Sequence, residues 1–157
     1  MFKKVVKRLV RLGVLEEDND SEWGAPYFAQ PKVKTNRFRF LSDFQNLNRQ
    51  LKRKPYPMPK KREMLTNLEV FQYTTSLDLN MGHYHIRLIM EDSNLCTIII
   101  LWKKYRYTRL PMGVRKAPDV FWEKINEMFC GFGVIREYID DFLTITKGGW
   151  YNNLEKL

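Results

Sequence analysis

The sequence predicts an α+β protein in which short antiparallel strands are combined with a few amphipathic helices. Apolar residues recur at helical spacing near the N-terminus and again after Pro118. Two pairs of short apolar runs, residues 95–102 with 105–110 and 134–139 with 142–145, are each separated by two polar residues, which is typical of β-hairpins. Helices mixed with hairpins favour an α+β class over a parallel α/β sheet.

The N-terminal segment predicts a short amphipathic helix that ends near Gly13, because Phe2, Val6 and Leu9 fall at helical spacing. A cleavable presequence is the alternative, but the segment has neither a Ser-rich stretch nor a small-residue cleavage signal. Residues 15–24 are acidic and polar, and we predict a loop there.

The middle of the chain predicts strands at residues 27–29, 37–41, 73–79 and 86–89, with a basic turn over residues 31–36. Three prolines within residues 52–59 exclude a helix or a central strand there, and Pro59 can open a following helix. Lys103 and Lys104 predict the turn of the first hairpin. The predicted helix after Pro118 ends at Gly131 and buries one stripe of side chains: Phe121, Ile125, Met128 and Phe129.

Composition narrows the class of protein. The chain has 157 residues, 44% hydrophobic and 29% charged, as expected for a globular domain. No apolar run approaches the roughly 18–20 residues of a membrane-spanning helix, and we expect no membrane partner. Two Cys and two His exclude a disulfide-dense secreted scaffold and a His-rich metal site. We therefore expect an intracellular protein of the cytoplasm or nucleus, not a secreted one.

The formal net charge of +9 indicates a polyanionic partner. Basic residues gather near the N-terminus, over residues 49–62 and over residues 103–116, with aromatic residues among them. Cations next to stackable rings suit a nucleic acid. The alternative for any single cluster is an ordinary solvated surface.

Asp140 and Asp141 lie at the tight connection between two apolar strands, in the segment Tyr138-Ile139-Asp140-Asp141. A turn that needs polar residues is one interpretation. The other is a metal site, because two adjacent carboxylates repel unless a cation lies between them and Mg²⁺ prefers carboxylate oxygens.

A two-metal site needs a third carboxylate, and Asp78 is the candidate because it ends an otherwise apolar strand. Capping of the turn that follows is the alternative role. The metal interpretation requires the strand before Asp78 and the hairpin of Asp140 and Asp141 to be neighbours.

These motifs, in this order, resemble the reverse transcriptase domain of gypsy-type LTR retrotransposons across nearly the whole chain. The matching pieces are Gly13-Val14-Leu15, Trp23-Gly24-Ala25-Pro26, residues 39–44, Leu47-Asn48, Tyr56-Pro57-Met58-Pro59, residues 76–79 with Gly82, His85-Ile86, Leu110-Pro111-Met112-Gly113, Ala117-Pro118 with Phe121, and residues 138–141. Residues 138–141 alone are weak evidence for this family, whereas the ordered series of motifs is specific to it.

The resemblance implies a right-hand polymerase fold with fingers at about residues 1–52 and 86–116. The palm, an antiparallel sheet backed by helices, would then occupy about residues 53–85 and 117–157. It also implies that the chain stops before the thumb and carries no ribonuclease H region. Further polyprotein segments or a second chain are the sources from which a thumb could come.

The implied activity is RNA-directed DNA polymerisation with an RNA or DNA template-primer and deoxynucleoside triphosphates. By resemblance, Asp78, Asp140 and Asp141 are the catalytic metal ligands, with the carbonyl of Leu79 beside them. They would hold two Mg²⁺ ions, with Mn²⁺ as the alternative. The implied nucleotide-binding residues are Arg39, either Lys32 or Lys34, His83, Met112 and Gly113.

Several positions depart from the family pattern. His83 stands where an aromatic residue usually excludes a ribonucleotide, so the choice between ribo- and deoxynucleotides stays open. Lys116 and Trp122 replace the usual Asn and Gln, and Trp122 either crowds its helix or covers a solvent-facing side. The departures suggest an alternative function, that of a catalytically inactive retroelement remnant that binds nucleic acid through its basic face.

Overall fold

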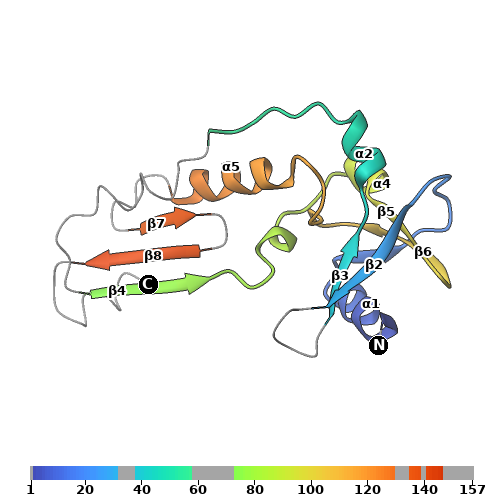
Figure 1. Cartoon of the computed structure of the whole chain (residues 1–157), viewed down its shortest axis with the longest axis horizontal. Helices are drawn as coiled ribbons and strands as arrows, with labels where there is room; N and C mark the ends of the chain where they lie inside the picture. The colour runs from blue at the N-terminus through green and yellow to red at the C-terminus, as the bar shows by residue number, and fades with distance from the viewer. Residues whose placement is uncertain (1, 32–37, 58–72, 130–134, 139–140, 147–157) are drawn as a thin grey trace. The chain divides into compact units, whose positions relative to one another are not determined.

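The structure, a computed structural model, describes residues 2–31, 38–57, 73–129, 135–138 and 141–146 (Figure 1). The chain divides into two compact units. Unit 1 comprises Met1–Arg53 and His83–Ala117, and unit 2 comprises Lys54–Gly82 and Pro118–Leu157.

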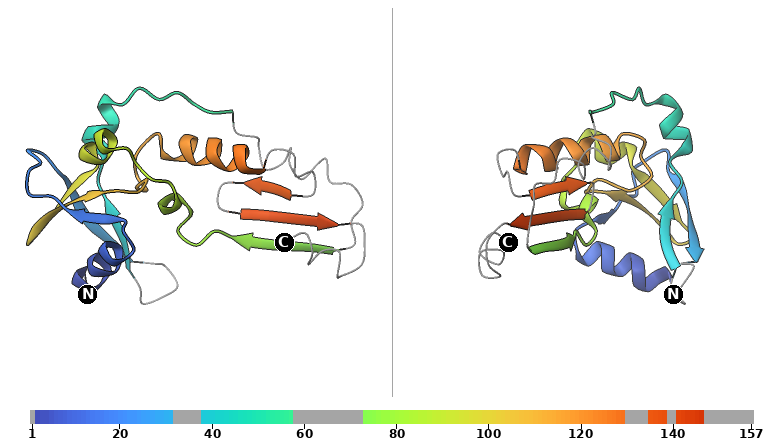
Figure 2. Two further views of the ribbon diagram at one scale, coloured as in Figure 1. Left: turned by 180° about the vertical axis from the view of Figure 1, so that it is seen from behind. Right: turned by 60° about the vertical axis from the view of Figure 1, so that its left-hand side comes forward.

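Unit 1 is built on a five-stranded sheet of order β1-β6-β5-β2-β3 (Figures 1 and 2). Its strands are β1 (Leu15–Glu17), β2 (Ala25–Pro31), β3 (Phe38–Ser42), β5 (Thr97–Ile100) and β6 (Lys103–Tyr107). Three of the pairings are antiparallel, whereas β2 and β5 run parallel with Ala25 opposite Ile98. The helices of this unit are α1 (Phe2–Arg11), α2 (Gln45–Gln50) and α4 (Met90–Leu95), and the 3₁₀ turn η1 (Gly82–His85) begins at its boundary.

The core of unit 1 forms where apolar side chains of α1 and the sheet meet. Val6 and Leu9 of α1 are 2% and 3% exposed, and Ile98 and Tyr107 from the central strands are equally buried. The predicted N-terminal helix is confirmed. It ends through Gly13, whose φ of 63° is left-handed and whose amide donates to the carbonyl of Val10.

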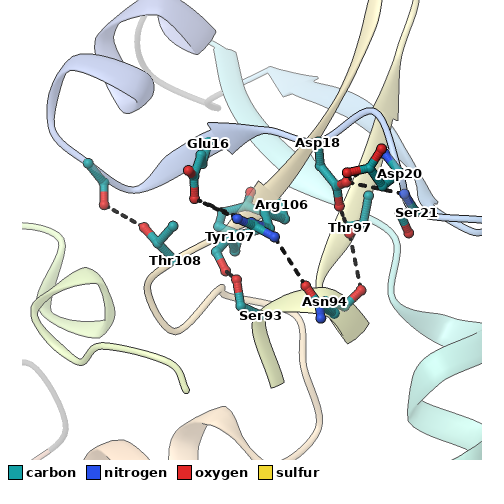
Figure 3. Close-up of polar contacts among 11 residues, drawn as sticks. Glu16, Asp18, Asp20, Ser21, Ser93, Asn94, Thr97, Arg106, Tyr107 and Thr108 are labelled. Carbon is teal, nitrogen blue, oxygen red and sulfur yellow. Dashed lines mark hydrogen bonds and ion pairs between the residues drawn. The ribbon is translucent and has the colours of Figure 1, made fainter. Parts of the chain in front are cut away.

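The predicted loop over residues 15–24 is wrong at its start, because β1 pairs with β6 in antiparallel register. Leu15 is buried, while Glu16 accepts from Arg106 on the partner strand (Figure 3). Glu17 accepts from Lys103 of the same strand. The acidic residues that suggested a loop therefore face cations across the sheet. A local sequence pattern does not reveal such cross-strand pairs.

Two further predictions in unit 1 need correction. Lys103 and Lys104 belong to β6, and the hairpin turn lies at Leu101 and Trp102. The predicted strand over residues 86–89 is reduced to a single bridge between Arg87 and Arg109. The strands predicted at 27–29, 37–41 and 95–102 are confirmed with shifted ends.

Unit 2 contains a three-stranded antiparallel sheet of order β4-β8-β7 and the helix α5 (Ala117–Phe129) (Figure 1). Its strands are β4 (Tyr73–Asp78), β7 (Ile135–Tyr138) and β8 (Asp141–Thr146). The two strands predicted for the second hairpin are confirmed, and so is the strand predicted before Asp78. The predicted helix after Pro59, the basic turn at residues 32–36 and the end at Gly131 lie outside the described residues.

The helix α5 contacts β8 of this sheet through an aromatic pair. Phe121 and Ile125 are buried as predicted, and the rings of Phe129 and Phe142 lie 4.9 Å apart between their centroids. Met128 is 67% exposed, so its predicted place in the buried stripe is wrong. Within the described part of the chain, no helix is both long and apolar enough to cross a bilayer.

Candidate functional site

Asp78 and Asp141 are direct partners across β4 and β8, at the last residue of one strand and the first of the other. Opposed residues of an antiparallel pair project from the same face, with Cα atoms about 4.5–5.5 Å apart. Both side chains are exposed. The two carboxylates are therefore neighbours although they are far apart in the sequence.

The pleat places these carboxylates on the face of the sheet opposite to α5. Phe142, the next residue of β8, is 6% exposed and packs against Phe129 of the helix. Successive side chains of a strand alternate between faces, so Asp141 projects away from the helix. Packing of Phe142 thus fixes the direction in which the acid points.

Asp141 also pairs with Tyr138 of β7, and only residues 139 and 140 connect the two strands. The connection has the length of the shortest common hairpin loops. Asp140 itself lies outside the described residues. Among the residues that the structure does describe, no three His, Cys, Asp or Glu side chains form a group suited to a metal.

The electrostatics of the pair favour a bound cation. Like charges directly opposite each other on neighbouring strands destabilise a sheet. Hard divalent cations such as Mg²⁺ take carboxylate oxygens as ligands and retain water in their remaining positions. The donor set offered by Asp78 and Asp141 fits such an ion.

A constrained turn follows β4. Leu79, half-buried, comes directly after Asp78, and Met81 adopts a left-handed φ of 60°. Non-glycine residues rarely adopt this conformation, and it is found most often where surrounding structure or function requires it. The turn leads into η1, where His83 is half-buried and its carbonyl accepts from the amide of Ile86.

The helix α5 holds the segment around Tyr56 by three hydrogen bonds. Asp119, 5% exposed, accepts from the amide of Tyr56 at 3.2 Å, and Asn126 donates to the Tyr56 hydroxyl at 3.1 Å. Trp122 is 3% exposed and its indole N–H donates to the carbonyl of Pro57 at 3.1 Å. Of the two interpretations of Trp122, solvent-facing cover is therefore wrong: the ring is packed inside unit 2 and hydrogen-bonded.

In unit 1, Asn48 clamps the turn that contains Met112 and Gly113. Its amide nitrogen donates to the carbonyl of Gly113 at 2.8 Å, and its amide oxygen accepts from the backbone N–H of Arg115 at 2.7 Å. Met112 is 44% exposed, so its side chain is free to meet a ligand. The sequence motif Leu47-Asn48 marked this residue, but nothing in the pattern revealed that it holds the turn.

Gly113 is required at its position. Its φ is 99°, and a Cβ atom there would lie 3.1 Å from the carbonyl oxygen of Ser42. Larger side chains would both strain the backbone and push this turn away from the sheet. The close approach fixes the turn over β3.

The buried Tyr107 contacts Ser42 of β3, and the half-buried Tyr84 packs against Tyr107. The hydroxyls of Ser42 and Tyr107 share a hydrogen bond of 2.9 Å, and the ring of Tyr84 stacks on that of Tyr107 at 6.2 Å. Burial raises the pKa of Tyr107 well above its usual value, and burial also raises the pKa of Tyr84. Both phenols therefore stay protonated as hydrogen-bonding groups at neutral pH.

The predicted triphosphate ligands are only partly covered by the structure. Arg39 belongs to β3 and pairs with Gln30 of β2. Lys32 and Lys34 lie outside the described residues, so the choice between them stays a prediction.

The fold matches solved reverse transcriptases. Foamy viral protease-reverse transcriptase in complex with double-stranded DNA superposes with a TM-score of 0.89 at 23% identity, over 99% of this chain and 27% of that one. The complex of the foamy viral enzyme with an RNA/DNA hybrid gives a TM-score of 0.86 at 22% identity, over 98% and 20% of the two chains. The fold is therefore the α+β fingers-and-palm fold of reverse transcriptases, as the sequence predicts.

Sequence relatives point to the retroelement type. The Pol polyprotein of transposon gypsy from Drosophila melanogaster is 28% identical over 155 residues, which cover 90% of this chain and 14% of the polyprotein. A putative enzymatic polyprotein of Cassava vein mosaic virus is 26% identical over 153 residues, which cover 93% and 24%. No family model matches the chain.

The chain spans between 11% and 33% of the length of the polyproteins and solved structures to which it is similar. It is similar in sequence to the retrovirus-related Pol polyproteins of the transposons gypsy, opus, 297 and 412, and the predicted resemblance to the gypsy type is confirmed.

Proposed function

We propose that this chain contributes the fingers and palm of an RNA-directed DNA polymerase that extends a primer by a two-metal mechanism. Unit 1 would be the fingers and unit 2 the palm. The observation that supports this most is the pairing of Asp78 with Asp141 at the ends of β4 and β8. Carboxylates held together on a sheet face are suited to phosphoryl transfer.

The proposed metal ligands are Asp78, Asp140 and Asp141, with the backbone carbonyl of Leu79. They offer only oxygen donors, which suits two Mg²⁺ ions, or Mn²⁺ in their place. When bound, the ions would lower the pKa of the primer hydroxyl and neutralise charge on the departing pyrophosphate. The strand pairing of Asp78 and Asp141 would fix the direction of two ligands before any ion binds.

The fingers would bind the deoxynucleoside triphosphate through cations. Arg39 and either Lys32 or Lys34 would donate charge-assisted hydrogen bonds to its phosphates. Met112 and Gly113 would lie beside the nucleotide and the template, on the turn that Asn48 holds. Asn48 would then be a positioning residue, because it acts through the backbone of that turn.

The residue at position 83 affects whether the site accepts a nucleotide with ribose or with deoxyribose. An imidazole is planar but smaller than the aromatic residue usual in this family, so we propose weaker exclusion of ribonucleotides. Incorporation of a ribonucleotide against its deoxy counterpart in the wild type and in a His83→Phe variant measures this directly.

Primer extension on an RNA template with Mg²⁺ tests the proposed activity. We expect extension by the wild type and a loss of at least about a hundredfold in Asp78→Asn and Asp141→Asn, because each removes a metal ligand. Asp20→Asn, the same chemical change in the exposed loop of unit 1, is the matched control and retains activity. Equal extension by Asp141→Asn and the wild type would contradict the proposal.

A second candidate is a remnant that binds nucleic acid without catalysis. The net charge of +9 and the departures at His83 and Lys116 favour it. It predicts binding to a template-primer that weakens steeply with salt, and no extension by the wild type under any divalent ion. Extension that depends on Asp141 excludes it.

A further inference from the structure

The helix α1 carries one continuous basic face. Its five cations are Lys3, Lys4, Lys7, Arg8 and Arg11, and all five side chains are exposed. At about 100° per residue they lie within an arc of about 140° around the helix. The helix contains no acidic residue, so this face is uniformly positive.

The cations of α1 differ from other basic residues of the chain in their partners. Arg106 of β6 is ion-paired with Glu16 (Figure 3). Lys103 of β6 is ion-paired with Glu17, and Lys124 of α5 with Glu127. By contrast, none of the ion pairs found among the described residues involves a side chain of α1. The charge of this face is therefore not neutralised within the described part of the fold.

This clustering of cations does not stabilise the helix α1. Lys3 and Lys4 lie at the positive end of the helix dipole, and Lys4 and Arg8 form a like-charge pair at a spacing of four residues. Both features destabilise an isolated helix. A polyanion placed against the face would relieve both.

The opposite face of α1 excludes one class of polyanion partner. Val6 and Leu9 are 2% and 3% exposed because they pack into unit 1. A helix that binds a membrane surface inserts its apolar face among the lipids. Here that face already belongs to the protein core, so the observations favour a nucleic acid.

An aromatic residue adjoins the basic face. The ammonium group of Lys3 lies 5.4 Å from the centroid of the Trp102 ring, at the turn of the β5–β6 hairpin. Leu101, beside Trp102, is 89% exposed. Cations that follow a backbone together with rings on which bases stack are typical of single-strand binding.

We propose that the exposed face of α1, together with Trp102, binds the phosphate backbone of single-stranded nucleic acid. This surface belongs to unit 1, whereas the carboxylates of β4 and β8 belong to unit 2, and it binds whether or not the chain polymerises. In the proposed polymerase it would hold the unpaired template strand, a role that rests on the proposed function.

Fluorescence anisotropy with a labelled oligo-dT of about 20 nucleotides, titrated at several salt concentrations, tests the proposal. In Lys4→Gln/Arg8→Gln we expect the slope of log K against log salt to become shallower by about 1.4, since each backbone contact contributes about 0.7 for a single strand. The matched control is Lys103→Gln/Lys124→Gln, which removes the same charge from cations already paired with carboxylates. The control should retain the wild-type slope, and circular dichroism should show equal helix content in all three proteins.

Equal slopes for the α1 variant and the wild type, or equal losses in the α1 variant and the control, would overturn the proposal. Cosedimentation with vesicles of phosphatidylcholine and phosphatidylserine distinguishes the membrane alternative. Vesicle binding that depends on Lys4 and Arg8, without a change in oligo-dT binding, would also overturn it. The oligo-dT titration requires no polymerisation, so failure of the polymerase proposal and failure of this one are separable.

Discussion

Asp78 and Asp141 face each other as paired residues of β4 and β8, and each occupies the strand end next to a turn. The pairing brings together two acids that are far apart in the sequence. It does so through backbone register, so the proximity does not depend on any side-chain contact. Phe142, packed on α5, keeps β8 in the orientation that this register needs.

Without divalent ions, the acid pair should destabilise the protein. We expect Asp78→Asn to raise the free energy of unfolding by about 0.2–1 kcal/mol at low salt, because it removes a repulsive cross-strand pair. The gain should shrink at high salt, where the repulsion is screened. Urea unfolding in the presence of EDTA, at low and at high salt, measures the gain and its dependence on salt. If Asp78→Asn were less stable than the wild type, the two carboxylates would not repel each other as proposed.

Asn48 should matter for the turn that contains Met112. Asn48→Ala removes two exposed hydrogen bonds, each worth about 0.5–1.5 kcal/mol, which should cost about 1–3 kcal/mol of unfolding free energy. In a primer-extension assay its KM for nucleotide should rise more than its kcat falls. Asn46→Ala, an exposed residue of the same helix, is the matched control. Equal stability of the two variants would show that the clamp is unimportant.

Gly113 and Gly13 offer a comparison between two left-handed glycines. Gly13→Ala should cost about 1 kcal/mol from backbone strain alone, since a Cβ at that position meets nothing within 4 Å. Gly113→Ala should cost more, because its Cβ would also lie 3.1 Å from the Ser42 carbonyl. Thermal unfolding of both variants measures the difference, and a smaller loss at Gly113 would contradict the close approach.

Alkaline pH should destabilise unit 1. Burial raises the pKa of the Cys96 thiol from 9.0 to about 12, with a smaller contribution from Asp92. Above pH 9 the unfolded chain releases this proton while the folded chain keeps it. The unfolding free energy therefore falls as pH rises from about 9 to 12, by up to about 1.4 kcal/mol per pH unit for one group.

Chemical unfolding at pH 8, 9.5 and 10.5 checks this dependence. Cys96→Ala should show a shallower fall than the wild type, with a remainder from Tyr84 and Tyr107, whose pKa values are also raised by burial. If the unfolding free energy of the variant and of the wild type fell equally with pH, Cys96 would not be a cause of the alkaline loss of stability.

Long-range pairing explains which parts of the fold could be predicted from sequence. The strand after Asp140 has a strong apolar pattern, and the strand before Asp78 has aromatic and β-branched residues, so local pattern was enough to find them. β1 was missed because Glu16 and Glu17 look like loop residues until their cationic partners on β6 are known. The short helices α2 and α4, each of six residues, have too few turns for a periodic signal.

For the candidate site, local motifs likewise identified individual residues but not how the fold brings them together. Asp78 and Asp141 could be named from motif order, whereas their opposition depends on a register that no single segment encodes. The clamp by Asn48 joins residues of two distant segments, so only the fold reveals it. Met128 was misassigned because helical spacing alone cannot decide where a buried stripe ends.

We propose that Asp78 and Asp141 share a divalent ion, and the decisive experiment is to measure Mn²⁺ binding by electron paramagnetic resonance. Bound Mn²⁺ loses the sharp signal of the free ion, so a titration of the full chain gives occupancy without any need for catalysis. We expect saturable binding by the wild type that Mg²⁺ competes away, and its loss in both Asp78→Asn and Asp141→Asn while Asp20→Asn binds normally. Undiminished binding by Asp78→Asn would contradict the claim.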